Sequence, residues 1–557
     1  MEFEWKIRIL NFMISSGRRP TGPRTTLACL YETNIDRGES MSMRASLIIT
    51  ALLAMASPAF AQITTAKVTG GEIAGRVIDG ISEFKGVPFA APPVGDLRWK
   101  GPRPVKPWSG VRQTIQYGPA CMQNGGGGGA GPGVPYSEDC LYLNVWSPAK
   151  SASEKLPVLA WIYGGAYVGG ATSNPLYDGT HFARRGVVFV SISYRVGPFG
   201  FLATPELSKE SGHGSGTYGI QDQIAGLKWI KRNISKFGGD PSKVTILGHS
   251  AGGFAVSMLA GSPLAKGLFR GVISESGGNF HPPEDFPWPG SNITTLRMAE
   301  ATGQAWLAKL GVHSIAEARA LPADKILAGA RGGRGARLWP PVDGYVDVGD
   351  QSVLWKEGRF NDTAIIVGDV SDETAAFGVR KSTPAAFEDM VRKGYGPAAD
   401  AILAAYPHAT DEEASRAATE LSSDTVFDWG QYTWARQQSK YGKGKAYVYW
   451  FDKPSARDPN GSPHGSEVAY VFGNLGLRGP PPSAEDRALS DEMQSYWVNF
   501  ARTLDPNGKG LPHWPHFTAA DPTVMRFGKD PGPAPDPIQA RMKALDAYYD
   551  WRRDGSK

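Results

Sequence analysis

The sequence is poor in cysteine and lacks the short motifs of protein metal sites. It holds three cysteines and nine scattered histidines in 557 residues, and contains neither a CxxC nor an HExxH spacing. No metal or other cofactor is therefore expected. The formal net charge of +5 is small, and no basic stripe with interleaved aromatic residues occurs, so we expect no nucleic-acid partner.

The sequence also lacks an N-terminal apolar run long enough to span a bilayer. The apolar run near the N-terminus extends only from Ala45 to Ala56, which is too short. It follows Arg44 and precedes Ala59-Phe60-Ala61, the layout of a secretory signal with a small-residue cleavage site. We predict a signal peptide over 41–61, cleavage near Ala61, and secretion to the periplasm or the medium. The alternative is a buried N-terminal helix.

Forty residues ahead of a signal peptide are unusual. The simplest interpretation is that translation starts at Met41 or Met43, so that 1–40 is a misassigned start; an amphipathic targeting extension is the alternative. Residues 62–557 then form a single catalytic domain. Cys29 is removed with the leader, and the remaining pair, Cys121 and Cys140, favours one disulfide over two free thiols in an exported chain. Nothing in the sequence indicates an oligomeric state.

Apolar runs of strand length alternate with helical patterns from residue 158 onward. Strands are predicted at 158–163, 187–194, 243–247, 271–274, 364–368 and 445–451, and helices at 222–237 and 252–260. This alternation predicts an α/β fold with a large, mostly parallel sheet covered by helices on both faces. The segment 375–440 has a polar, helical pattern and is expected to be an insertion over the sheet.

The sequence GHSAG at 248–252 places Ser250 between a predicted strand and a predicted helix. In that context the motif forms a tight turn that exposes the serine hydroxyl at the sheet edge, and the helix start directs backbone N–H groups toward a developing anion. Ser250 is therefore the candidate nucleophile.

A serine hydroxyl requires a base, and the base requires an orienting acid. In this kind of fold the chain order is serine, acid, histidine. Acid candidates follow the strand at 364–368, and histidine candidates lie further on: Asp369, Asp372, Glu373; His408, His464, His513. His249 adjoins Ser250 on a tight turn and cannot serve as its base.

The oxyanion of an acyl-transfer intermediate requires at least two N–H donors. The segment YGGAY at 163–167 follows the strand at 158–163 and supplies small residues where backbone must approach the substrate. An ordinary turn is the alternative interpretation of this glycine pair.

These residues resemble the type-B carboxylesterase and cholinesterase family of α/β-hydrolases. The similarity runs in family order through most of the chain, in the segments FKGVPFAAPPVGDLRW (84–99), SEDCLYLNVW (137–146), FGGDPSKVTILGHSAGG (237–253), PHGSEVAYVFG (463–473) and YWVNFARTLDPNG (496–508).

The resemblance implies a role for individual positions. It makes Ser250 the nucleophile, Glu373 the acid and His464 the base, and assigns the oxyanion hole to the backbone N–H groups of Gly165, Ala166 and Ala251. It further implies a Cys121–Cys140 disulfide, the structural ion pairs Arg98–Glu138 and Arg195–Asp222, and support of the acid by Ser276.

The sequence departs from the family pattern at two residues and in one loop. His249 replaces the usual glutamate before the nucleophile; it either tunes the pKa values of the site or contacts substrate, or it only packs there. Thr374 replaces the glycine after the acid, which leaves Asp372 open as an alternative to Glu373. The 121–140 loop lacks the tryptophan that binds quaternary ammonium groups, so choline esters are not expected as preferred substrates.

Together these features predict a serine carboxylic-ester hydrolase that forms an acyl-enzyme on short-chain or aryl esters, with a small-molecule ester as its partner. The alternatives are a specialised hydrolase of carbamate, feruloyl or mycotoxin esters, and a non-catalytic binding domain. Aromatic residues suggest an apolar acyl or aryl pocket, although such residues are as often plain core: Trp161, Tyr167, Phe286 and Trp288.

Overall fold

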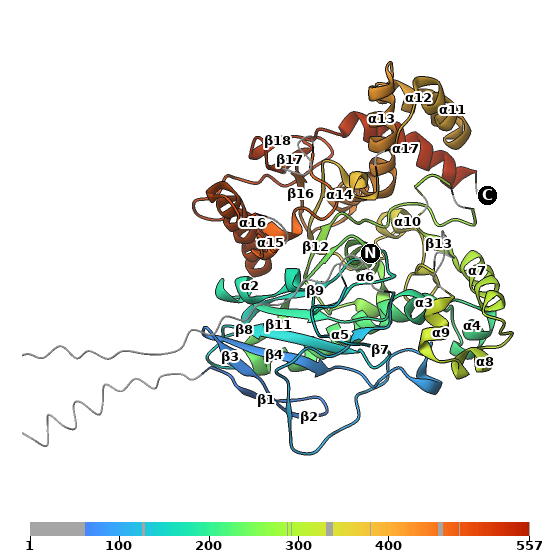
Figure 1. The fold of residues 1–557 in the computed structure, drawn as a ribbon. Helices are drawn as coiled ribbons and strands as arrows, with labels where there is room; N and C mark the ends of the chain where they lie inside the picture. Colours follow the sequence, from blue (N-terminus) through green and yellow to red (C-terminus); the bar gives the residue numbers. More distant parts are fainter. Residues whose placement is uncertain are drawn as a thin grey trace, which may run out of the picture. The chain divides into compact units, whose positions relative to one another are not determined.

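An eleven-stranded sheet organises the fold in this computed structural model (Figure 1). The structure describes residues 62–124, 129–286, 288–290, 292–329, 338–378, 380–454, 461–477 and 480–555. The predicted extension 1–40 and signal peptide 41–61 lie outside these residues. In sheet order the strands are β18 Gly532–Pro535, β17 Thr523–Phe527, β16 Ala446–Phe451, β15 Ala364–Val370, β12 Gly271–Glu275, β11 Gly239–His249, β9 Leu156–Ile162, β10 Val188–Ile192, β8 Tyr142–Ser147, β4 Ile81–Pro88 and β3 Arg76–Ile78.

The seven strands from β17 to β10 pair in parallel, which confirms the predicted mostly parallel sheet. Strands β10, β12, β15 and β16 are buried at every residue. Both of their faces are therefore covered, which is why they occur in the sequence as continuous apolar runs rather than as alternating patterns. Antiparallel strands β8, β4, β3 and β18 extend the sheet at its two edges.

Sixteen α-helices lie in the described part of the chain. They are α2 Thr180–Arg184, α3 Gly197–Phe201, α4 Pro205–Ser211, α5 Tyr218–Asn233, α6 Ala251–Gly261, α7 Leu296–Lys309, α8 Ile315–Ala320, α9 Ala323–Ala328, α10 Gln351–Lys356, α11 Pro384–Gly394, α12 Ala399–Ala405, α13 Asp411–Ser423, α14 Trp429–Tyr441, α15 Val468–Phe472, α16 Ala484–Thr503 and α17 Gln539–Asp554. None of these described helices combines the length and the hydropathy of a membrane-spanning segment.

Two helices pack against strands in the centre of the sheet. Helix α6 packs against β9, β11 and β12, and α14 packs against β15 and β16. The helices α11, α12, α13 and α17 contact one another and form the group at the top of Figure 1. A π-helical turn, Asp424–Asp428, joins α13 to α14 and also contacts β15. The predicted helical insertion thus reaches back to the end of a central strand.

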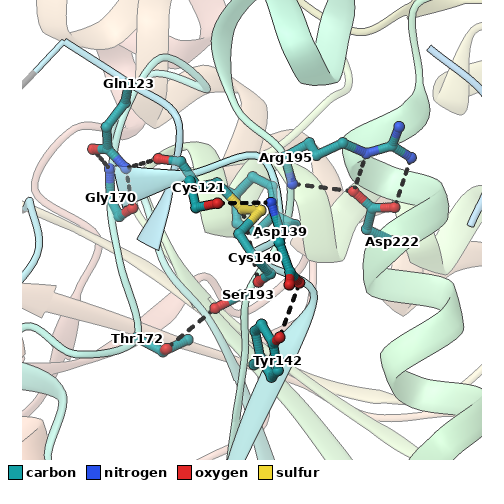
Figure 2. Close-up of a disulfide and its surroundings, with 12 residues drawn as sticks. Cys121, Gln123, Asp139, Cys140, Tyr142, Gly170, Thr172, Ser193, Arg195 and Asp222 are labelled. Atoms are coloured by element: carbon teal, nitrogen blue, oxygen red, sulfur yellow. Dashed lines mark hydrogen bonds and ion pairs between the residues drawn. A yellow bond between two sulfur atoms is a disulfide. The ribbon is translucent and has the colours of Figure 1, made fainter. Parts of the chain in front are cut away.

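A disulfide joins Cys121 to Cys140, with 4.9 Å between the Cα atoms (Figure 2). Next to it, Gln123 fixes the loop that follows β9: its Nε2 donates to the Gly170 carbonyl at 2.8 Å, and its Oε1 accepts from the Gly170 N–H at 2.9 Å. The ion pair of Arg195 with Asp222, at 2.7 Å, lies in the same view. The disulfide loop is therefore tied to the backbone that carries Gly165 and Ala166.

Replacing both cysteines with serine should lower the free energy of unfolding. The bridged residues are 19 apart in sequence, and a closed loop of this size contributes about 3 kcal/mol in the chain-entropy model. Scanning calorimetry of the double variant should show a melting temperature a few degrees lower. Reductant should lower the melting temperature of the wild-type protein and leave that of the double variant unchanged; a reductant-insensitive wild-type protein would contradict the prediction.

Candidate active site

Ser250 occupies the sharp turn between β11 and α6. Its backbone has φ 57° and ψ −124°, a conformation that is strained for any residue with a Cβ atom. The Ser250 N–H donates to the Glu275 carbonyl at 2.8 Å, which holds the turn against the end of β12. The side chain is only partly buried, so the hydroxyl remains accessible.

Glycines allow this turn because neighbouring backbone segments approach it closely. A Cβ atom on Gly252 would lie 2.0 Å from the Ile162 carbonyl oxygen, and one on Gly248 would lie 2.2 Å from the Gly252 carbonyl oxygen. A Cβ atom on Gly164 would lie 2.8 Å from the Ser250 Cβ. The glycines of the motif are therefore required by contact distances, and the 163–167 segment lies directly against the serine.

Gly165 and Ala166 have the backbone geometry of a loop that exposes its N–H groups. Both lie at positive φ, 117° and 54°, and neither N–H donates to another of the described residues. Ala251 is the first residue of α6, where backbone N–H groups have no partner within the helix. Among the described residues, the N–H groups of Gly165, Ala166 and Ala251 thus have no backbone acceptor, and Ala251 directly follows Ser250.

Tyr163 and Tyr194 fix the start of this loop. Their rings stack with centroids 4.4 Å apart. The Tyr163 hydroxyl donates to the Tyr194 carbonyl at 2.9 Å, and the Tyr194 hydroxyl donates to the Tyr163 carbonyl at 2.8 Å. Such reciprocal bonds hold Gly164 and Gly165 at a constant distance from the sheet.

Glu373 and His464 form a hydrogen-bonded pair. Glu373 follows β15 and is 0 % exposed, and its Oε1 accepts from the Val370 N–H at 3.0 Å. The other carboxylate oxygen, Oε2, accepts a short hydrogen bond from His464 Nδ1. His464 Nε2 has no partner among the described residues, so it is free to accept a proton.

The other acid and base candidates lie elsewhere. Asp372 is engaged through its backbone, because its N–H donates to the Ser462 carbonyl at 3.0 Å and so holds the Glu373 and His464 loops together. His408 packs on Phe387 and hydrogen-bonds the Tyr406 carbonyl, and His513 is exposed. No hydrogen bond joins Ser250 to His464 in the described structure, a common feature of sites without bound substrate.

Thr374 and Ser276 act differently from the family pattern. The Thr374 N–H donates to Ser423 Oγ at 3.1 Å and its hydroxyl to the Thr419 carbonyl at 3.0 Å, which anchors the loop after Glu373 to α13. Ser276 was expected to support the acid, but its Oγ is buried without a hydrogen-bond partner among the described residues. Its backbone N–H donates to the Gly368 carbonyl instead.

His249 packs over His464, with ring centroids 4.6 Å apart. Its Nε2 lies 3.9 Å from the Glu467 Oε1. Burial, and then the proximity of His464, place the pKa of His249 well below its ordinary value, so the ring is neutral. Burial and the nearby Glu275 and Glu373 carboxylates raise the pKa of Glu467 well above its ordinary value. Sequence reasoning missed Glu467, although it lies three residues after His464.

A cavity of about 870 Å³ lies near this constellation, although Ser250, Glu373 and His464 are not among its lining residues. Its lining includes Val426, next to Phe427, whose ring lies 4.7 Å from that of His464. Trp339, also in the lining, packs on Tyr167 beside Ala166.

Of the four aromatics named from the sequence, Phe286 and Trp288 line this cavity. Trp161 is instead a core residue against Tyr177 and Phe472, because β9 buries both of its faces. Tyr167 is also buried, and it packs on Phe201 as well as on Trp339.

The sheet, the serine turn and the glutamate–histidine pair define an α/β-hydrolase. The sequence profile of the carboxylesterase family matches residues 58–545. The chain is 35% identical over 532 residues to the fumonisin B1 esterase of Sphingopyxis macrogoltabida, covering 92% of this chain and 95% of the relative. It is 33% identical over 480 residues to the para-nitrobenzyl esterase of Bacillus subtilis, with 80% and 91% covered.

Solved structures agree with these relatives. A structure of a PNB esterase superposes with a TM-score of 0.76 at 30% identity, covering 87% of this chain and 99% of the other. The carboxylesterase EST55 of Geobacillus stearothermophilus gives a TM-score of 0.75 at 32% identity, with 87% and 100% covered. The chain belongs to the carboxylesterase family, and it is an enzyme that hydrolyses carboxylic esters.

Proposed function

We propose that this esterase acts through Ser250, His464 and Glu373 on short-chain or aryl esters. The observation that carries the proposal is the Glu373–His464 hydrogen bond, which leaves Nε2 without a partner among the described residues, in a ring that packs on His249 next to Ser250. Ser250 Oγ bonds to the ester carbonyl carbon while His464 Nε2 takes the hydroxyl proton. The resulting oxyanion accepts from the N–H groups of Gly165, Ala166 and Ala251.

The tetrahedral intermediate then breaks its bond to the alcohol oxygen, which receives the proton from His464 Nε2. This leaves an acyl group on Ser250 Oγ. Water attacks the acyl carbon and gives its proton to His464, and the carboxylic acid leaves as Ser250 regains its hydrogen. Glu373 holds the imidazole in one tautomer and balances its positive charge throughout.

The test is hydrolysis of p-nitrophenyl esters from acetate to decanoate by the purified protein. A maximum of kcat/KM at two to four acyl carbons is expected from this proposal, with aryl esters such as p-nitrophenyl benzoate also accepted by the cavity next to Phe427. A maximum at eight or ten carbons would contradict the short-chain preference.

A specialised substrate is the second candidate, because the match to a fumonisin B1 esterase covers 92% of the chain. Over its described residues, the cavity lining combines aromatic side chains with one arginine, Arg380, and one glutamate, Glu284. Release of the side-chain acids from fumonisin B1, followed by mass spectrometry, compares this substrate with p-nitrophenyl acetate; a kcat/KM at least tenfold higher for fumonisin B1 would favour the specialised role.

We also propose that the mature enzyme is a secreted single domain beginning near Gln62, after removal of a signal peptide at 41–61. The layout of charged, apolar and small residues ending at Ala61 supports this. N-terminal sequencing of the exported protein should read from Gln62. A protein retained in the cytoplasm with residues before 41 intact would contradict it.

Exchange of His249 for glutamate should move the acid limb of the kcat/KM profile to higher pH, by about one unit. A carboxylate beside His464 would stabilise the imidazolium, which raises the pKa of that ring and reduces the unprotonated fraction at low pH. The measurement is p-nitrophenyl acetate hydrolysis between pH 5 and 9. His249→Gln is the neutral control and should leave the limb in place; an unmoved limb in both variants would make His249 a packing residue.

A further inference from the structure

A group of three buried carboxyls lies behind the glutamate–histidine pair. Asp369, Glu373 and Asp428 each place a carboxylate oxygen within 4.8 Å of the others. Asp369 is 5 % exposed, Asp428 is 1 % exposed and Glu373 is fully buried. The proposed reaction uses Glu373 alone, which leaves the two aspartates without an assigned task.

The π-helical turn brings Asp428 to this position. Asp424–Asp428 interrupts the run from α13 to α14 with π geometry, a feature that is frequent at functional sites because it redirects successive side chains. The ring of Phe427 lies 4.7 Å from that of His464. The next residue, Asp428, places its carboxyl near those of Asp369 and Glu373. Asp369 comes from β15, four residues before Glu373.

Charge around the group makes three ionised carboxylates unfavourable. Asp369 faces Glu373, Asp424 and Asp536, and Asp428 faces Asp369, Asp424 and Glu373. Burial, and then these neighbouring carboxylates, raise the pKa of both Asp369 and Asp428 well above the ordinary value. Within the described residues, no lysine, arginine or histidine forms an ion pair with either aspartate.

The cations that do face this region are already engaged. Arg541 of α17 pairs with Asp424 at 2.7 Å, and His464 pairs with Glu373. Asp424 is also one of the carboxylates whose charge opposes ionisation of Asp428. Arg541 thus provides a counter-charge for Asp424, whereas Asp428 forms no ion pair among the described residues.

Both oxygens of Glu373 have protein partners, the Val370 N–H and His464 Nδ1. In contrast, Asp369 Oδ1 and Asp428 Oδ1 are buried with no hydrogen-bond partner among the described residues. A buried, unpaired carboxylate oxygen is costly, whereas a neutral carboxylic acid is tolerated in such a position.

We propose that Asp369 and Asp428 are positioning residues, which act as neutral carboxylic acids packed behind Glu373 and so keep Glu373 as the single negative charge facing His464. This inference rests on the proposed role of Ser250, Glu373 and His464. It adds two residues, Asp369 on β15 and Asp428 on the π-helical turn, that affect how strongly Glu373 stabilises the imidazolium of His464.

The experiment compares Asp369→Asn, Asp428→Asn, Asp369→Leu and Asp428→Leu in the full chain, with p-nitrophenyl acetate between pH 5 and 9. Asparagine has the shape and neutrality of a protonated aspartate. Both Asn variants should therefore keep kcat within threefold and leave the acid limb of kcat/KM in place. Leucine is bulkier than aspartic acid and has no polar atoms, so it overpacks the space beside Glu373 and displaces that side chain. We therefore expect kcat to fall about 10- to 100-fold with little change in KM.

Asp347→Asn is the matched control, because Asp347 is another buried carboxyl with an unpartnered oxygen outside this group, and it should leave the acid limb unmoved. An acid limb that moves to lower pH in either Asn variant would show that a negative charge had been removed, and would overturn the proposal. Wild-type kinetics in both Leu variants would also overturn it.

Thermal unfolding and metal analysis complete the test. Thermal unfolding identifies Leu variants that have lost activity only because they are unfolded; in that case the Asn pH profiles alone decide. Metal bound to the purified wild-type protein at one equivalent, with activity lost on chelation, would make the group a metal site and overturn the proposal. Absence of esterase activity in the wild-type protein, or its persistence in Ser250→Ala, would instead refute the proposed function on which the inference rests.

Discussion

Replacing Ser250 with alanine should lower kcat for p-nitrophenyl acetate by roughly 10⁵- to 10⁶-fold. The substitution removes the only atom that the mechanism bonds to the substrate. The backbone turn is retained, because alanine accepts the same positive φ at the same cost. The N–H groups of Gly165 and Ala166 should still bind the ester, so KM should change little and residual hydrolysis above the uncatalysed rate should remain.

The measurement pairs initial rates with stoichiometric labelling by a serine-directed phosphonate. Wild-type protein should incorporate one label per chain at Ser250, and Ser250→Ala should incorporate none. Ser242→Ala is the matched control, because this exposed serine lies on the same strand, β11. Activity in Ser250→Ala within tenfold of the wild-type value would assign the chemistry to another residue.

The second large effect is expected for Glu373→Gln, with kcat reduced about 10⁴-fold. The Val370 N–H fixes one side-chain atom of residue 373, so glutamine would keep its carbonyl oxygen there and present its NH₂ group to His464 Nδ1. That arrangement favours the imidazole tautomer with the proton on Nε2, which cannot accept the serine proton. The loss of the negative charge further destabilises the imidazolium.

Asp372→Asn is the informative comparison, because the sequence left this residue open as the alternative acid. In the structure Asp372 connects the two loops through its backbone N–H, which the substitution preserves, so kcat should remain within tenfold. A larger loss in Asp372→Asn than in Glu373→Gln would transfer the role of acid to Asp372. Circular dichroism and thermal unfolding of each variant provide the check on folding.

Much of the fold could be predicted from the sequence because buried parallel strands carry a strong signal. The runs at 158–163 and 364–368 are apolar throughout, as β9 and β15 require, and they were recognisable without any partner. The antiparallel edge could not be predicted in the same way. All three residues of β3 are exposed, and β18 contains two prolines, so neither strand shows apolar alternation.

The same contrast applies to the site. GHSAG was recognisable because a serine turn demands glycines at fixed positions, and the Gly252 contact with Ile162 shows why. Asp428 could not be recognised in this way, because its approach to Glu373 depends on a π-helical turn. A one-residue change in helical register leaves no signature in the apolar pattern of the sequence. The expected support from Ser276 is also not seen, since its hydroxyl makes no hydrogen bond to Glu373 in the described structure.

The separation between scaffold and cavity has a consequence for altering this enzyme. Ser250, Glu373 and His464 follow the ends of three sheet strands, whereas the cavity near Phe427 is lined from segments around 284–302 and 380–426, outside the sheet. Libraries for directed evolution can therefore randomise the cavity-lining residues of 284–302 and 380–395 to select for new acyl or alcohol groups, while keeping Thr419, Ser423 and the π-helical turn, which hold the Glu373 loop. Substitutions introduced there would leave the strand ends unchanged. Ser250, Glu373 and His464 would therefore keep the geometry in which every selected substrate must react.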